Sequence, residues 1–229
     1  GRPEVGGQRL IRFLTAAQGG PLEGAALGAL SSFHFTEGGY DDAARYLEQM
    51  LAVEPALLNG MFGAVFQAYS AAQHAAEAEE RHLDAVALIR GKISILRAFL
   101  PDETEAMRSY LQSIYFHYHQ AGEYGRAAQA IRDWAAEAPL NDEDRAYVDE
   151  TASLFLQAAQ LSGYTERRDV QLDYTELAVA FAELLDGGAD PRLGHALRER
   201  AAARENLGLT EEATADLQKA LAVLAQSDE

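Results

Sequence analysis

Two histidines in the segment His117-Tyr118-His119 are the residues whose type and spacing come closest to a chemical site. Imidazoles bind transition metals and exchange protons near neutral pH. The surrounding residues predict a helix, and residues two apart on a helix do not share a face. A metal site built from this pair alone is therefore disfavoured. The pattern favours one histidine packed against a neighbouring helix and the other facing a groove.

Paired carboxylates at Asp41-Asp42 and Glu79-Glu80 are the next candidates. We expect them at helix starts or on solvated faces, and glycosidase-like chemistry would need a defined separation across a cleft. The patterns GxxxxGK[ST], HExxH and GxSxG are absent, as is GxGxxG after a strand. We therefore expect a protein that is not an enzyme, with no catalytic residue, no metal site and no cofactor.

Composition excludes further classes of site. The 229 residues include no cysteine, which rules out disulfides and thiolate metal sites. With 19 Lys+Arg against 36 Asp+Glu, the net charge is −17. This charge argues against nucleic-acid binding, which needs a basic surface. The acidity is typical of a solubilising surface, and it also favours a basic partner.

Hydropathy gives no sign of a membrane protein. No apolar run approaches the roughly 18 residues of a membrane-spanning helix. Gln8, Arg9 and Arg12 interrupt the first twenty residues, which do not resemble a signal peptide. A cytoplasmic protein is expected. Because the chain begins Gly1-Arg2 without methionine, we also expect a processed or truncated sequence.

The segment Gly122–Pro139, GEYGRAAQAIRDWAAEAP, predicts the helix on which the rest of the chain is patterned. A glycine turn opens it and a proline ends it. Ala127 and Ala128 are small enough for another helix to approach closely, and Ile131 and Trp134 follow at helical spacing. One such helix cannot bury its apolar face alone.

Equivalent residues recur through the chain with a period of 42 or 43 residues. One column contains Ala43, Ala85, Ala127, Val170 and Ala213. A second, four positions later, contains Leu47, Ile89, Ile131, Tyr174 and Leu217, and a third, sixteen positions before the first, contains Leu27, Tyr69, Leu111, Leu154 and Leu197. Helical arrays repeat at roughly 34 to 47 residues, and each unit buries its apolar face on its neighbours. The match to these three columns is weakest in the fourth unit.

These stretches resemble the second helix of the tetratricopeptide repeat (TPR). The likeness lies in a glycine before the helix and a small residue within it, found in Gly38–Pro55, Gly122–Pro139 and Gly208–Leu221, and in a proline that follows the first two of these helices. It covers nearly the whole chain and is specific for fold rather than function. The period exceeds the common repeat of roughly 34 residues, so longer helices are required. Glu80 and Thr165 replace the inter-helix glycine in two units, and irregular turns are expected there.

The resemblance implies an all-α, right-handed solenoid of about five antiparallel helix pairs. One continuous domain is expected over residues 1–229. A short helix near residues 8–18 would either cap the array or belong to an earlier repeat, with Gly6-Gly7 resembling an inter-helix turn. That N-terminal element covers residues 1–20, and the repeats are expected at about 22–55, 56–100, 102–139, 141–188 and 190–227.

Four local signals add detail to this scheme. Asn141 and Asp190 are predicted helix N-caps. Gly91, inside a predicted helix, costs up to about 1 kcal/mol relative to alanine and is expected to allow close helix packing. Arg200 and Arg204 stand where the other units mostly have apolar or aromatic residues.

The resemblance also implies where a partner would bind, because the first helix of each TPR pair lines the concave side of the array. The expected partner-binding residues are Phe35, Gln67, Ser70, His74, Gln112, Phe116, His119, Phe155, His195 and Arg198. The first three units offer no lysine, arginine or asparagine there, so the carboxylate clamp of chaperone-binding repeats is not expected. A groove lined mainly by phenylalanine, histidine, glutamine and serine suits an extended peptide or a helix. Alternatively, Phe35 and Phe116 simply pack between helices.

The leading hypothesis is a non-catalytic scaffold that binds a protein or peptide in this groove. One alternative is a ligand-sensing or regulatory module of a larger signalling or transcription-regulating protein. The start within a repeat and the basic helix near Arg192 favour that alternative. Another is a self-associating module that forms a homo-oligomer through the ends of the solenoid.

Overall fold

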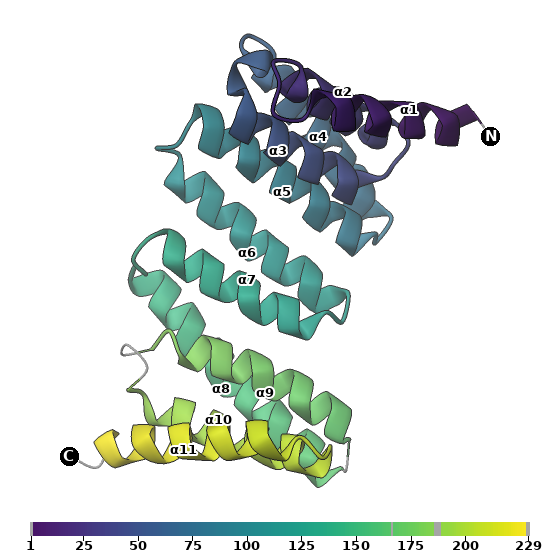
Figure 1. The fold of residues 1–229 in the computed structure, drawn as a ribbon. Helices are drawn as coiled ribbons and strands as arrows, with labels where there is room; N and C mark the ends of the chain where they lie inside the picture. Colours follow the sequence, from purple (N-terminus) through teal and green to yellow (C-terminus); the bar gives the residue numbers. More distant parts are fainter. Residues whose placement is uncertain (1, 166, 186–188, 228–229) are drawn as a thin grey trace. The chain divides into compact units, whose positions relative to one another are not determined.

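The computed structural model of the chain is helical throughout (Figure 1). It describes residues 2–165, 167–185 and 189–227, and no strand occurs within these ranges. The all-α expectation is confirmed.

The helices fall into two compact units, Gly1–His117 and Tyr118–Glu229, with the boundary inside α6. The first unit holds α1 (Arg2–Ala17), α2 (Glu23–Thr36), α3 (Tyr40–Val53), the 3-10 helix η1 (Pro55–Leu58), α4 (Phe62–Ala78), α5 (His82–Phe99) and most of α6 (Thr104–Gln120). The second holds the end of α6, α7 (Tyr124–Glu137), α8 (Asp142–Tyr164), α9 (Arg168–Ala182), α10 (Pro191–Asn206) and α11 (Thr210–Ser227). The single continuous domain expected over residues 1–229 stays a prediction.

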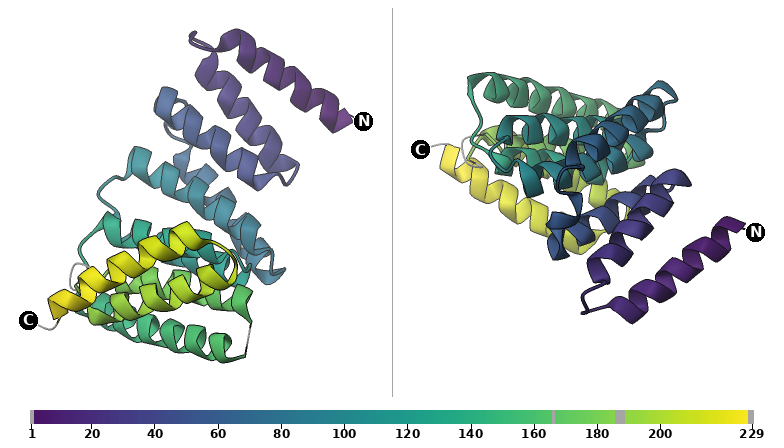
Figure 2. Two further views of the ribbon diagram at one scale, coloured as in Figure 1. Left: turned by 60° about the horizontal axis from the view of Figure 1, so that its bottom comes forward. Right: turned by 90° about the horizontal axis from the view of Figure 1, so that it is seen from above.

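Consecutive helices pack as pairs. In the first unit α2 packs on α3 and α4 on α5, and in the second α8 packs on α9 and α10 on α11 (Figures 1 and 2). The connections within these pairs are short, so the partners are antiparallel. One pair packs on the next through α3 and α5 in the first unit, and through α9 and α10 in the second. This is the helix-pair architecture that the repeat predicts.

In three repeats, the turn between the two helices contains a glycine in the left-handed conformation. The φ angles of Gly38, Gly122 and Gly208 are 78°, 75° and 81°. Glu80 occupies the same place in the second repeat with φ of 55°. The irregular turn expected at Glu80 is therefore wrong, because glutamate takes the glycine conformation there at a cost of roughly 1–2 kcal/mol. Thr165, with φ of −90°, does not adopt it.

The first helix is longer than expected. It begins at Arg2 rather than near residue 8, and it includes Gly6 and Gly7, which were expected in a turn. A Cβ added at Gly7 would lie 3.1 Å from Cε1 of Phe33, and one at Gly6 would lie 3.4 Å from Cε2. The two glycines therefore let a ring of α2 rest on the backbone of α1.

The repeat columns lie in the core in most units. Ala43, Ala85 and Ala127 are fully buried, and Ile89 and Ile131 pack beside them. These alanines let the second helix of each pair approach its neighbours closely, as the sequence predicts.

In the fourth repeat Val170 and Tyr174 are only half-buried, and two further members of the columns are exposed. Leu154 is 56% exposed, because α8 is 23 residues long and buries Val148, Ala152 and Ala159 instead. Leu217 is 43% exposed, since the buried face of α11 runs through residues 213, 216, 220 and 223.

Both predicted N-caps are confirmed. Asn141 Oδ1 accepts a hydrogen bond from the Asp144 amide at 2.8 Å, and Asp144 Oδ2 accepts one from the Asn141 amide at 3.0 Å. These reciprocal bonds form a capping box at the start of α8. Asp190 Oδ1 accepts from the Arg192 amide at 2.8 Å, directly before Pro191 opens α10.

Candidate functional site

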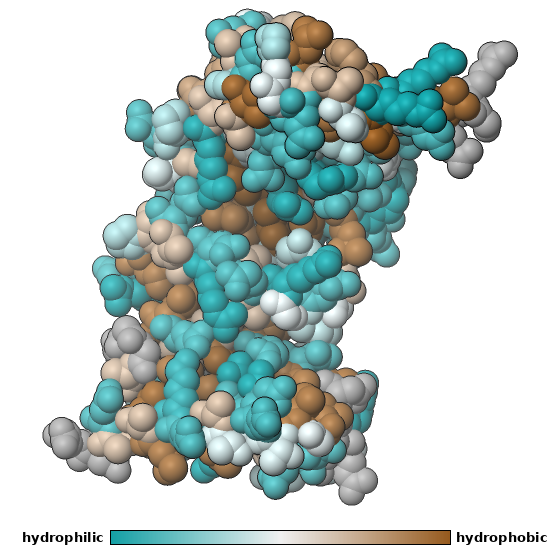
Figure 3. Space-filling model, viewed as in Figure 1, coloured by the Kyte–Doolittle hydropathy of each residue, from teal (hydrophilic) through white to brown (hydrophobic). Residues whose placement is uncertain are grey.

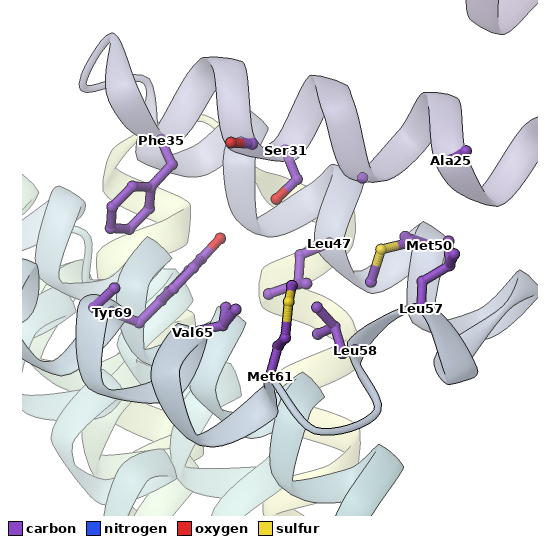
Figure 4. A pocket seen from close by; sticks show the side chains of 13 residues that line it. Ala25, Ser31, Phe35, Leu47, Met50, Leu57, Leu58, Met61, Val65 and Tyr69 are labelled. Atoms are coloured by element: carbon purple, nitrogen blue, oxygen red, sulfur yellow. The ribbon is translucent and has the colours of Figure 1, made fainter.

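An open apolar pocket of about 390 Å³ lies within the first unit (Figure 4). Ligand pockets in proteins commonly measure about 300–1,000 Å³. Side chains converge on it from α2, α3, η1 and α4, and they include Phe35, Leu47, Met50, Leu58, Val65 and Tyr69. None of the lining residues carries a charge. We call this cavity the unit-1 pocket.

Small residues and a sharp turn create the space. Ala25 and Gly28, one turn apart, present almost no side chain from α2. A Cβ added at Gly28 would lie 3.1 Å from Sδ of Met50, so glycine brings α2 close to α3. Pro55 then opens η1, which places Leu58 at the pocket wall before the chain turns at Gly60, with φ of 76°.

Phe35 and Tyr69 form one end of the unit-1 pocket (Figure 4). Their ring centroids are 4.8 Å apart. The Tyr69 ring also lies on α5 at Gly91, where an added Cβ would be 2.3 Å from Cε1. Close packing at Gly91 is what its position in the helix predicts. The end wall is therefore fixed by three helices.

The Tyr69 hydroxyl is buried and makes no hydrogen bond within the described part of the chain. Burial raises the pKa of Tyr69, and the nearby Ser31 hydroxyl opposes that rise. Ser31 Oγ donates its own proton to the Ala43 carbonyl at 2.9 Å. An unpaired buried hydroxyl costs about 1–3 kcal/mol. Ser31, Ser32 and Tyr69 are the residues with polar side chains among those that line the pocket.

The expected partner-binding residues of the first unit have different surroundings. Phe35 lines the unit-1 pocket. On α4, Gln67 and His74 are exposed, while Ser70 Oγ donates to the Phe66 carbonyl at 3.0 Å. On α6, Gln112 is exposed and Phe116 is 52% exposed.

In the second unit, the structure brings His119 and Phe155 together. Their ring centroids are 5.8 Å apart, and His119 also packs edge-on against Tyr124 at 5.5 Å. Burial lowers the pKa of His119. His195 is half-buried on α10, and Arg198 is exposed with Nη2 3.5 Å from Glu199.

A partly buried ion network joins α9, α10 and α11. Arg200 donates to both carboxylate oxygens of Asp216, at 2.9 and 2.7 Å, and to Glu176 at 2.9 Å. Arg204 donates to Asp216 at 2.8 Å and to Glu176 at 2.9 Å. Two arginines and two carboxylates balance one another, so the network crosslinks three helices without net charge. This explains the two arginines at positions that other repeats fill with apolar or aromatic residues.

A second polar network crosses α4, α5 and α6 in the first unit. Lys92 Nζ donates to Gln73 Oε1 at 2.9 Å, and Gln73 Nε2 donates to Glu77 Oε1 at 2.7 Å. His117 Nε2 lies 3.2 Å from the same Glu77 oxygen, and His117 Nδ1 lies 3.3 Å from His82 Nδ1. His117 is thus the histidine that packs against neighbouring helices. No sequence signal pairs it with His82, which is 35 residues away.

The surface mixes apolar and polar side chains. Figure 3 shows apolar residues interspersed with hydrophilic ones over the face in view. Within the described residues, no helix combines the length and apolar character needed to cross a bilayer.

Comparisons with known proteins give structural likenesses only. No family model and no curated protein matches the chain. A putative kinesin light chain with nearly identical TPR-like repeats from Podosopora anserina is 18% identical, with 89% of this chain and 95% of that chain covered and a TM-score of 0.31. BtubC (BKLC) from P. vanneervenii is 17% identical, with 99% and 90% covered and a TM-score of 0.32. At such values, nothing about the function of this chain follows from the likeness.

Proposed function

We propose that the chain is a non-catalytic scaffold that binds a protein or peptide, and that its first unit does so by accepting an apolar side chain in the unit-1 pocket. The observation that carries the proposal is an open pocket whose walls are apolar and come from successive helix pairs. Large side chains anchored in such pockets supply most of the binding energy at protein interfaces. Phe35 and Tyr69 would contact the anchor with their rings.

Charge around the pocket favours a basic partner. The segment that builds the pocket, residues 23–78, carries seven carboxylates and one arginine: Glu23, Glu37, Asp41, Asp42, Glu48, Glu54, Glu77 and Arg45. Lysine or arginine residues flanking the anchor would be attracted to this surface, mainly through the association rate and its dependence on salt. The partner is therefore a peptide segment with an apolar anchor and basic neighbours.

Other residues expected at inner positions of the repeats would extend the contact in each unit. In the first unit these are Gln67, Ser70 and His74 on α4, with Gln112 and Phe116 on α6. In the second they are His119, Phe155, His195 and Arg198, as a separate surface.

A ligand-sensing module is the second candidate, and the size of the unit-1 pocket favours it. A volume of about 390 Å³ is sufficient for a small apolar molecule. Such a ligand would need no basic groups, since the pocket walls carry no charge.

A tryptophan placed at Ala68 tests the proposal. Ala68 lines the pocket from an exposed position on α4, so Ala68→Trp fills the pocket without disturbing the core. Ala71→Trp is the matched control, because Ala71 is exposed on the same helix and does not line the pocket. The probe is a displayed peptide library of mixed charge. We expect basic peptides with an apolar anchor to bind the wild type and Ala71→Trp, and to be lost with Ala68→Trp.

The other outcomes separate the two candidates. If Ala68→Trp selects the same peptides with the same yield, the pocket is not the peptide site. If no peptide binds, but native mass spectrometry of the wild type shows a small molecule that Ala68→Trp lacks, the sensing module is supported instead.

A further inference from the structure

We propose that His82 and His117 bind a divalent transition-metal ion at the ends of α4, α5 and α6, away from the unit-1 pocket. His117 and His119 are close in sequence, but a helix directs them to different faces. The structure instead brings together two imidazoles from different helices. Their Nδ1 atoms are 3.3 Å apart. Two nitrogens that each lie about 2.05 Å from one tetrahedral ion are separated by about 3.3 Å.

Glu77 orients His117 for this role. His117 Nε2 lies 3.2 Å from Glu77 Oε1, so the proton of neutral His117 lies on Nε2 and the Nδ1 lone pair points toward His82. A carboxylate behind a histidine is the usual support for a metal-binding imidazole, because it fixes the ring and raises its basicity. Gln73 holds the same Glu77 oxygen at 2.7 Å, and Lys92 holds Gln73 at 2.9 Å.

The surroundings allow an ion to enter. His117 is buried, with 4% exposed, whereas His82 is partly exposed at the first position of α5. Within the described residues, no group of three or more His, Cys, Asp or Glu side chains is placed to hold a metal, so water would have to complete the coordination of an ion held by His82 and His117. The nearby Arg81 is paired with Glu79 and Asp84. The Glu77 carboxylate would offset part of the charge of the ion.

The turn before α5 holds His82 in place. Glu80 has the left-handed φ of 55°, and its carbonyl accepts from the His82 amide at 3.0 Å. A strained residue beside a histidine pair is consistent with a functional position. When the site holds no ion, His82 Nδ1 donates its proton to His117 Nδ1. On binding, the His82 proton transfers to its own Nε2, and both Nδ1 lone pairs bind the ion.

Nitrogen ligands and an open geometry define the class of ion. Copper(II) binds such sites more tightly than zinc(II), and both prefer imidazole to oxygen ligands. With only two protein ligands, we expect readily reversible binding.

The experiment is a titration of the metal-free full chain, without a polyhistidine tag, with zinc(II) and separately with copper(II). Calorimetry gives the stoichiometry and affinity, and the melting temperature gives an independent readout. We expect one ion per chain and a higher melting temperature. His82→Gln should weaken binding at least tenfold, and Glu77→Gln, which keeps both ligands, should weaken it by about 10–100-fold. His34→Gln, which changes a first-unit histidine beside Asp42, is the matched control and should bind as the wild type does.

Two results would overturn the proposal. One is the absence of saturable binding at one ion per chain, and the other is equal affinity in the wild type and His82→Gln. His117→Gln removes the other proposed ligand and is a further test, provided that this variant unfolds cooperatively. If the buried substitution unfolds the chain, His82→Gln alone decides, because His82 is partly exposed.

Discussion

The Tyr69 ring of α4 rests directly on the backbone of α5 at Gly91. A Cβ added at Gly91 would lie 2.3 Å from Tyr69 Cε1 and 2.7 Å from Cδ1, which is closer than any two such carbons can approach. Phe35 packs on Tyr69 with centroids 4.8 Å apart, so the ring contacts both α2 and α5. This contact sets the spacing of α4 and α5 and the end wall of the unit-1 pocket.

Gly91→Ala should therefore lower the free energy of unfolding. Overpacking of a well-packed core costs about 1–3 kcal/mol, which exceeds the gain of about 1 kcal/mol in helix propensity. Gly63→Ala is the control, because an added Cβ there has no neighbour within 4 Å. It should leave stability unchanged or raise it by up to about 1 kcal/mol. Urea unfolding of both variants measures the difference, and equal effects would show that the Tyr69 contact is not limiting.

Glu80→Gly should stabilise the first unit by about 1 kcal/mol, since it removes the penalty of a left-handed residue with a Cβ. Glu80 is exposed, so little packing is lost. Glu37 serves as the control: it is the C-cap of α2 with φ of −85°, where glycine gains nothing. Glu37→Gly should be neutral or destabilising in the same thermal melts. A loss of stability in Glu80→Gly would mean that the glutamate side chain contributes more than its backbone costs.

Local patterns in the sequence predict most of the fold. Ala43, Ala85 and Ala127 mark the second helix of successive repeats because small residues are needed wherever two helices come close. Asn141 and Asp190 mark helix starts through hydrogen bonds to amides only two or three residues away. Leu154 is exposed, although the repeat pattern predicts a buried residue at this position. Because α8 is longer than the first helices of the other pairs, a fixed offset from the second helix of the pair does not lead to the buried face of α8.

The candidate sites are only partly predictable, because they depend on side chains that are distant in sequence. Phe35 was expected at an inner position, and it lines the unit-1 pocket. The opposite wall needs η1, whose single turn after Pro55 has no counterpart in the repeat pattern. The pairing of His82 with His117 depends on the packing of α5 and α6, and no local spacing encodes it.

Stability should fall as the pH drops below about 6.5. Burial lowers the pKa of His117 from 6.5, with Glu77 opposing this and His82 adding to it, and burial also lowers the pKa of His119. Below pH 6.5 the unfolded chain therefore binds more protons than the folded chain, and the difference favours unfolding. This stability is fully present above pH 6.5 and is lost as the pH falls through the folded pKa values.

Urea unfolding at a series of pH values from 7.5 downward measures the slope of the free energy of unfolding against pH. His117→Gln, which cannot titrate, should flatten it, whereas His34→Gln should leave it nearly as steep as in the wild type. An unchanged slope in His117→Gln would assign the effect to other groups.

Asp216→Ala should destabilise the second unit by up to about 3–5 kcal/mol, because it leaves the largely buried Arg200 and Arg204 with half of their partners. Asp216 is only 4% exposed and accepts from both arginines, so water cannot replace it without opening α10 and α11. Lys219→Ala in the same unit, which removes an exposed lysine from its pair with Glu183, should cost no more than about 1 kcal/mol. The single tryptophan, Trp134, is buried in α7, and its fluorescence reports the unfolding of the second unit. A small loss in Asp216→Ala would mean that Glu176 alone can neutralise both arginines.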